Sequence, residues 1–193
     1  MNVALYFGSF NPIHVGHLII AQYMVQRKEI DAVWFVVSPH NPFKKKSTLL
    51  EDYHRLAIVK IAIEDEPHFK AEDIEFKMPQ PSYTIDTLAY LREKHPTINF
   101  SLLMGEDNLV GFHKWKNYEK ILENHTVFVY PRMEHEPLEH ELKNHPAIVF
   151  CEDVPVMKIS ASYIREVIKS GNSTRYLLTE KVFQYVDEMN FYR

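Results

Sequence analysis

The stretch VALYFGSFNPIHVGHLIIAQYMVQ (residues 3–26) decides the fold of this chain. Residues 3–7 are a short apolar run that predicts a buried strand, and residues 18–26 have the pattern of a helix. Gly8 lets the backbone turn tightly and approach a ligand with no side chain in the way. The helix expected to begin near Gly16 offers unpaired N–H groups and the positive end of its dipole, which favour phosphate. This segment therefore predicts an anion-binding loop between a strand and a helix.

The rest of the chain continues the alternation of strands and helices. We expect strands at 32–37, 99–104, 126–130 and 147–151, with weaker strand signals around Phe69 and Ile74. We expect helices from about 51 to 63, from a Ser82 cap to about 94, and at 115–122, 160–169 and 180–189. This order predicts an α/β fold, Rossmann-like, with a mostly parallel sheet, helices on both faces and C-terminal helices.

The same pattern predicts where the chemistry lies. Ligands of such sheets bind outside the carboxyl ends of the strands, so we expect the site in the loops after strands one, two, four and six. We see no internal repeat and no low-complexity linker, and 193 residues are enough for a single domain over residues 1–193.

Composition narrows the class of protein. Apolar residues make up 46% and charged residues 25%, as in ordinary globular proteins, and the net charge of −4 argues against a nucleic-acid partner. Cys151 is the only cysteine, so no internal disulfide can form. No apolar run approaches the ~20 residues that span a bilayer, and residues 1–7 lack the features of a signal peptide. We expect a cytoplasmic protein without a membrane partner; the oligomeric state stays open.

Two histidines at the expected helix entrance are candidate catalytic groups. His14 and His17 lie three positions apart, which can aim both rings at one site. A neutral imidazole donates one N–H and a protonated imidazole two, so either form stabilises charge on a phosphoryl oxygen. Two alternatives remain from the residues alone. The pair could be ordinary surface histidines, or part of a metal site, although no third ligand lies nearby in sequence.

A second candidate phosphate site lies at residues 159–165, which read ISASYIR. Ser160 or Ser162 is expected to cap a helix, which places Arg165 near the helix start. A cation there opposes the helix dipole, and this misfit is relieved when an anion occupies the helix start. The alternative is a plain capped helix with a surface arginine.

Residues 8–17 resemble the G-x-F-x-P-x-H-x-G-H signature of the HxGH nucleotidyltransferase superfamily, and residues 159–165 resemble its I-S-S-T-x-I-R signature. Ala161 and Ser162 depart from the second signature, and only the hydroxyl at 162 is kept. Residues 81–88 (PSYTIDTL), 105–108 with Trp115, and the proline-rich 39–44 loop resemble bacterial nicotinate-mononucleotide adenylyltransferases. Phe43 and Lys116 depart from the usual residues of that family, which affects the pyridine pocket.

The resemblance implies a role for each matching residue. It implies that the catalytic residues are His14, His17 and Arg165, and that the ATP-binding residues are Gly8, Ser9, Phe10, Gly105, Asp107, Arg132, Ile159, Ser160 and Ser162. It implies that the mononucleotide is bound by Lys44, Ser82, Thr84 and Trp115. The nicotinate carboxylate would meet the N–H groups near Thr84, the pyridine ring would stack on Trp115, and a lysine among 44–46 would meet phosphate. No protein metal ligand is expected, and Mg²⁺ would enter with ATP.

The reaction so implied joins ATP and nicotinate mononucleotide into nicotinate adenine dinucleotide and pyrophosphate, a step of NAD biosynthesis. The alternatives are a sister transferase acting on phosphopantetheine or nicotinamide mononucleotide or making a cytidylyl product, and a non-catalytic nucleotide sensor. A redox enzyme that uses a finished dinucleotide ranks last, because G-x-G-x-x-G is missing after the first strand.

Overall fold

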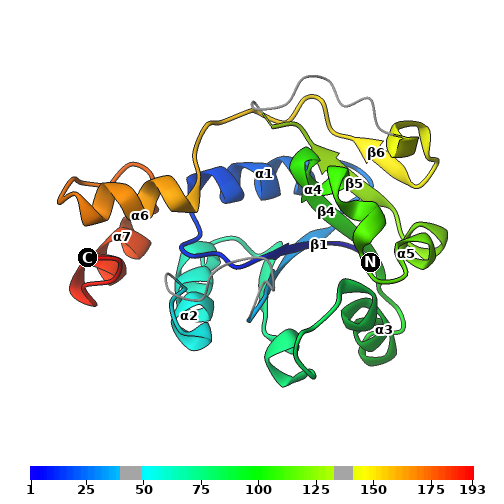
Figure 1. The fold of residues 1–193 in the computed structure, drawn as a ribbon, viewed down its shortest axis with the longest axis horizontal. Coiled ribbons are helices and arrows are strands. Elements are labelled where there is room, and N and C mark those ends of the chain that lie inside the picture. Colours follow the sequence, from blue (N-terminus) through cyan, green and yellow to red (C-terminus); the bar gives the residue numbers. More distant parts are fainter. Residues whose placement is uncertain (40–48, 133–140) are drawn as a thin grey trace.

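The computed structural model describes residues 1–39, 49–132 and 141–193, and its centre is a six-stranded parallel sheet in the order β3-β2-β1-β4-β5-β6 (Figure 1). The strands are β1 (Asn2–Gly8), β2 (Ala32–Val37), β3 (Phe69–Glu72), β4 (Asn99–Gly105), β5 (Val127–Tyr130) and β6 (Ile148–Phe150). The order reverses between β1 and β4, where Leu5 pairs with Leu102. This reversal is the place where open parallel sheets bind ligands.

Helices cover both faces of the sheet. One face packs against α1 (Val15–Val25), α2 (Asp52–Ile63), α6 (Ala161–Lys169) and α7 (Glu180–Glu188). The other face packs against α3 (Thr84–Lys94), α4 (Glu106–Val110), η3 (Phe112–Lys114) and α5 (Tyr118–Asn124). Two short 3-10 helices, η2 (Ile74–Lys77) and η4 (Glu141–Asn144), complete the described elements. In Figure 1, α6 and α7 lie at the end of the molecule away from α3 and α5.

The strands form where the sequence is apolar on both faces. All six residues of β2 are buried, because this strand lies between β1 and β3 with helices above and below it. Alternate residues of β1 divide between the two cores: Ala4 and Tyr6 join the core under α1 and α2, and Val3 and Leu5 join the other. This continuous apolar run is the pattern of a parallel strand buried on both sides.

The expected Rossmann-like α/β fold is confirmed, with three local corrections. Ile74 lies in the 3-10 helix η2, so the strand expected around it is wrong. Trp115 ends η3, and the helix expected from that residue begins only at Tyr118, because Asn117 takes a left-handed conformation with φ 53°. Ser82 does not cap α3, whose N-cap residue is Tyr83. Within the described residues, no helix is long and apolar enough to cross a membrane.

Candidate active site

The loop between β1 and α1 brings the two histidines together. His14 is the N-cap residue of α1, and its ring stacks on that of His17 with centroids 3.8 Å apart. The backbone N–H of His14 donates a hydrogen bond to Nδ1 of His17 at 3.2 Å. A Cβ at Gly16 would lie 3.0 Å from the His14 ring, so glycine at this position leaves room for the stacked pair. The signature spacing thus produces one compact imidazole pair at a helix start.

His14 is held neutral by its surroundings. The residue is only 6% exposed. Burial, and then the positive charge of Arg132, lower the pKa of His14 from 6.5 to about 4. Nδ1 of this ring is buried without a hydrogen-bond partner. An anion that enters beside His14 and Arg132 would find two groups prepared to meet negative charge.

Phe10 adopts a strained conformation in the same loop. Its φ of 43° lies in the left-handed region, which bulky residues seldom occupy. The buried Phe10 ring packs edge-on against His17, with centroids 5.2 Å apart. A Cβ at Gly8 would lie 3.0 Å from that ring. Phe10 therefore packs against His17, and Gly8 leaves room for the Phe10 ring. Both residues have this packing role in addition to the ATP contacts expected of them.

Gly105, Asp107 and Arg132 form a second part of the site at the ends of β4 and β5. Nε of Arg132 lies 3.4 Å from Oδ1 of Asp107. A Cβ at Gly105 would collide with that carboxylate oxygen and lie 3.0 Å from Nε of Arg132. A side chain at this position would therefore displace the ion pair. The loop after β5 contributes Arg132, which the resemblance implied as an ATP-binding residue although this loop was not among those expected from the sheet alone.

A pocket of about 340 Å³ opens between these two parts. The lining residues are Tyr6, His14, Gly16, His17, Ile20, Tyr130, Pro131, Arg132, Pro155, Met157 and Ile159. The hydroxyls of Tyr6 and Tyr130 lie 2.9 Å apart and share a hydrogen bond. Burial raises the pKa of both phenols, so both stay protonated and polar without carrying charge. The pocket combines cationic, imidazole and hydroxyl donors, which suits a phosphate chain.

The second signature approaches the first through Arg165. Nη1 of Arg165 donates to the backbone carbonyl of Asn11 at 2.7 Å, and Nη2 donates to Oγ of Ser162 at 3.1 Å. Ser160 caps α6, because its hydroxyl accepts from the N–H of Tyr163. Segments that are 154 positions apart in sequence thus meet at one edge of the sheet.

The expected mononucleotide residues lie in a separate group around the start of α3. Thr84 is the first residue of α3, where the first N–H groups of a helix have no acceptor one turn back, although the N–H of Asp86 donates to the Tyr83 carbonyl at 2.9 Å. Trp115 is half-buried, and its ring packs against Phe112 with centroids 5.1 Å apart. Lys116 donates to both carboxylate oxygens of Asp86, at 3.0 and 2.8 Å, which ties the Trp115 turn to α3. Lys44 lies outside the described residues.

A buried carboxylate connects the two groups. Glu75 accepts a hydrogen bond from the Thr87 hydroxyl at 2.8 Å and further bonds from the side chains of Ser38 and Ser82. Burial raises the pKa of Glu75, while these three bonds oppose that shift. The backbone N–H of Ser38 in turn donates to the carbonyl of Gly8 at 2.9 Å. Ser82 therefore acts here through Glu75, not as a helix cap.

Several polar residues of the site were missed from the sequence. They are Tyr6, Asn11, Arg55, Glu75 and Tyr130, and all five are buried. Arg55 had a detectable signal, because it falls on the helical stripe of Ile58, Val59 and Ile63, where a charge is out of place. The other four had none, since their partners come from distant segments.

The donor set suits ATP that arrives with its metal. Among the residues described, no group of three His, Cys, Asp or Glu side chains is arranged to hold an ion. Asp107, the carboxylate beside the pocket, is already paired with Arg132. A magnesium ion held mainly by phosphate oxygens and water needs no protein cage.

A family model described as cytidylyltransferase-like matches residues 5–167, which is most of the chain. With this match, the parallel sheet and the histidine pair at the start of α1 define a nucleotidyltransferase. A "probable nicotinate-nucleotide adenylyltransferase" of Flavobacterium johnsoniae is 55% identical over 193 residues, 100% of each chain. One of Bacteroides fragilis is 41% identical, covering 94% of this chain and 89% of its own. The chain therefore belongs to the family of nicotinate-nucleotide adenylyltransferases.

Solved structures agree on the fold. The nicotinic acid mononucleotide adenylyltransferase of Plasmodium falciparum, solved in complex with NaAD, superposes with a TM-score of 0.82. The alignment covers 99% of this chain and 97% of that one, at 22% identity. At this level of identity, the likeness concerns the fold alone.

Proposed function

We infer that this enzyme transfers the adenylyl group of ATP to nicotinate mononucleotide, forming nicotinate adenine dinucleotide and pyrophosphate. The single observation that carries this inference is the hydrogen bond from Arg165 to the carbonyl of Asn11, 2.7 Å long. It joins the α6 start to the loop of His14 and His17, so two potential phosphate sites become one. The full-length similarity to nicotinate-nucleotide adenylyltransferases supports the choice of substrates.

The mechanism needs no nucleophile from the protein. The mononucleotide phosphate attacks the α-phosphorus of ATP directly, and the bond to the pyrophosphate oxygen breaks. The protein contributes alignment and charge stabilisation. His14, His17 and Arg165 face the phosphates, with Ser160, Ser162 and the backbone of Gly8, Ser9 and Phe10 as further contacts.

The remaining ATP contacts come from the β4 and β5 ends. Asp107 accepts from the ribose hydroxyls, Arg132 adds positive charge beside His14, and Gly105 and Ile159 provide the surface on which the nucleotide lies. ATP would enter with Mg²⁺, which no group of the described side chains is arranged to hold and which would supply positive charge beside the triphosphate. The place of Arg132 and Ile159 in the pocket lining and the Arg132–Asp107 pair support these roles.

Nicotinate mononucleotide binds at the other group. The N–H groups at the start of α3, near Thr84, meet the carboxylate, with Ser82 beside them. Trp115 stacks on the pyridine ring, and Lys44 meets the phosphate. We propose also that residues 1–193 act as one cytoplasmic domain, with small molecules and not nucleic acid or membrane as partners.

A pyrophosphate-release assay with Mg·ATP tests the function. Nicotinate mononucleotide, nicotinamide mononucleotide and phosphopantetheine are supplied separately. Fast turnover with the nicotinate compound alone is the expected result. Equal use of the amide would keep the reaction and remove the carboxylate-reading role of the Thr84 segment. Turnover only with phosphopantetheine would assign a sister activity, and silence with all three would favour a nucleotide sensor.

A further inference from the structure

Arg55 is a fully buried cation in the first turn of α2, on the same face as the buried Ile58, Val59 and Ile63. Its side chain is 0% exposed, and it lies on α2 one turn before the buried Ile58. A guanidinium has five N–H donors, and a buried charge is costly unless its hydrogen bonds are made. All five have acceptors: the carbonyls of Leu50, Ser9, Ser38 and Pro39, and the carboxylate of Asp52.

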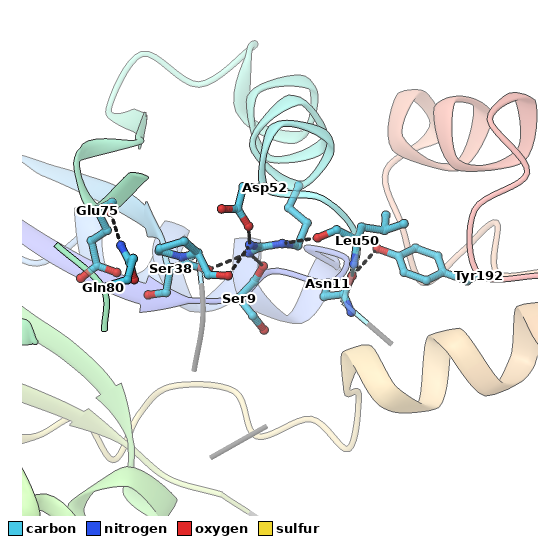
Figure 2. Close-up of polar contacts among 10 residues, drawn as sticks. Ser9, Asn11, Ser38, Leu50, Asp52, Glu75, Gln80 and Tyr192 are labelled. Atoms are coloured by element: carbon cyan, nitrogen blue, oxygen red, sulfur yellow. Dashed lines mark hydrogen bonds and ion pairs between the residues drawn. The ribbon is translucent and has the colours of Figure 1, made fainter. Parts of the chain in front are cut away.

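The acceptors belong to two different loops (Figure 2). Nη1 donates to the carbonyl of Ser9, in the loop after β1, at 2.6 Å and to that of Ser38, directly after β2, at 2.9 Å. Nη2 donates to Pro39 at 3.3 Å, and Nε donates to Leu50 at 3.0 Å. Arg55 therefore holds the chain where it leaves β2 and where it returns before α2, and fixes both places to the histidine-bearing loop.

The same network continues toward Arg165. The backbone N–H of Leu50 donates to Oδ1 of Asn11 at 3.2 Å, and the Asn11 carbonyl accepts from Arg165. Tyr192 donates to the same Oδ1 at 2.9 Å (Figure 2). A connected set of bonds thus leads from Arg55 through Leu50 and Asn11 to a proposed phosphate-binding arginine.

Stability alone is a weak reason for such a residue. Replacing a buried ion pair by apolar side chains of similar volume is often neutral or stabilising, so burial of Arg55 needs another explanation. Its carboxylate partner, Asp52, is 41% exposed, whereas the carbonyls of Leu50, Ser9, Ser38 and Pro39 accept its four other hydrogen bonds. The fork geometry of arginine suits several fixed acceptors at once, which lysine does not reproduce.

We propose that Arg55 is a positioning residue: it sets the loop after β1, which faces ATP, relative to Ser38 and Pro39 after β2, where the Ser38 side chain contacts Glu75 near the start of α3. This inference rests on the proposed function, because direct displacement requires two substrates in line. A misplacement of about 1 Å costs on the order of 10²-fold in rate. Arg55 itself touches neither substrate.

The test compares Arg55→Lys with two controls on the same helix. Ile58→Ala removes a buried apolar side chain one turn away, and Asp52→Asn removes the carboxylate but leaves the carbonyls in place. For Arg55→Lys we expect kcat to fall on the order of 10²-fold, with a much smaller change in KM for ATP. Both controls should keep kcat near the wild-type value at temperatures where they are folded.

The outcomes separate positioning from stability. Arg55→Lys with wild-type kcat would overturn the proposal, and so would Ile58→Ala with an equal loss of kcat at an equal loss of Tm. If Arg55→Lys fails to fold, Arg55→Gln takes its place, since its amide can still donate to two carbonyls.

A second measurement does not depend on activity. The backbone N–H groups of Ser38 and Leu50 donate hydrogen bonds to Gly8 and Asn11. Their hydrogen exchange with solvent therefore reports directly whether Arg55 holds the two loops in place. Relative to amides inside β1, both should exchange faster in Arg55→Lys but not in Ile58→Ala. Unchanged exchange would overturn the inference, whereas a wild type inactive with nicotinate mononucleotide, nicotinamide mononucleotide and phosphopantetheine would overturn only the proposed function.

Discussion

The backbone N–H of His14 donates to Nδ1 of His17, and this bond fixes the tautomer of the His17 ring. Because Nδ1 accepts, the proton of the neutral ring lies on Nε2, which becomes the donor of that imidazole. Stacking on His14, with centroids 3.8 Å apart, fixes the plane of the same ring. The helix start thus prepares one N–H in advance of any ligand.

His17→Ala should lower turnover on the order of 10²–10³-fold, because one preorganised donor is lost at the reacting phosphate. The thermal midpoint should change far less, since His17 is only half-buried. His68→Ala is the control, because this exposed histidine pairs with Glu66 away from the pocket. Steady-state pyrophosphate release measures the turnover of both variants, and thermal unfolding measures their midpoints. Turnover near the wild-type value in His17→Ala would contradict the site.

The pKa of His14 makes a pH prediction for stability. Its folded value of about 4 lies below the unfolded value of 6.5. The folded state therefore binds fewer protons than the unfolded state in this window, so stability is complete above pH 6.5 and is lost as the pH falls toward 4. Between pH 7.5 and 5, this histidine alone should remove about 2 kcal/mol of unfolding free energy.

The comparison with His14→Asn isolates that contribution, because all other titrating groups are common to both proteins. Urea unfolding at the two pH values should show a larger loss in the wild type than in the variant. Equal losses would mean that His14 is not held neutral.

Gly105→Ala should weaken ATP binding about tenfold, which corresponds to about 1.4 kcal/mol. The added methyl group collides with Asp107 and crowds Arg132, so the ion pair must separate. Gly111→Ala is a matched control, because its Cβ would meet only the Asn108 carbonyl at 4.0 Å. KM for ATP measures both variants. Similar KM values for the two would show that the Gly105 contact is unimportant.

Trp115→Ala should raise KM for the mononucleotide with little change for ATP, because stacking on an aromatic ring contributes about 1–3 kcal/mol per base. Trp115→Phe keeps a flat face and should retain most of the affinity. An equal loss for both substrates in Trp115→Ala, or no recovery with phenylalanine, would contradict the stacking role.

The sequence predicted the fold and the closeness of His14 and His17 for physical reasons. Runs such as AVWFVV at 32–37 are apolar throughout because they are buried on both faces, so they are visible without a structure. His14 and His17 are close in sequence, and the conformation at the start of α1 brings their rings into contact.

The errors arose where distant partners decide the local structure. Ile74 and Glu75 are both buried although they are adjacent, which no strand with one buried face allows. Glu75 is drawn inward by bonds to Ser38, directly after β2, and to Ser82 and Thr87, around the start of α3. The turn at Trp115 depends on Asn117, one of the residue types that accept a left-handed backbone.

The hydrogen bond between Tyr192 and Asn11 spans 181 positions of the sequence, so it can form only some time after Asn11 has been synthesised. A ribosome that adds about 5–20 residues per second takes roughly ten to forty seconds to make the intervening chain. Until Arg165 and Tyr192 have been made, the loop of the two histidines lacks the hydrogen bonds that these residues donate to Asn11. A nascent chain can assemble its first strands early, but it becomes able to bind its substrates only after Arg165 and Tyr192 have been made.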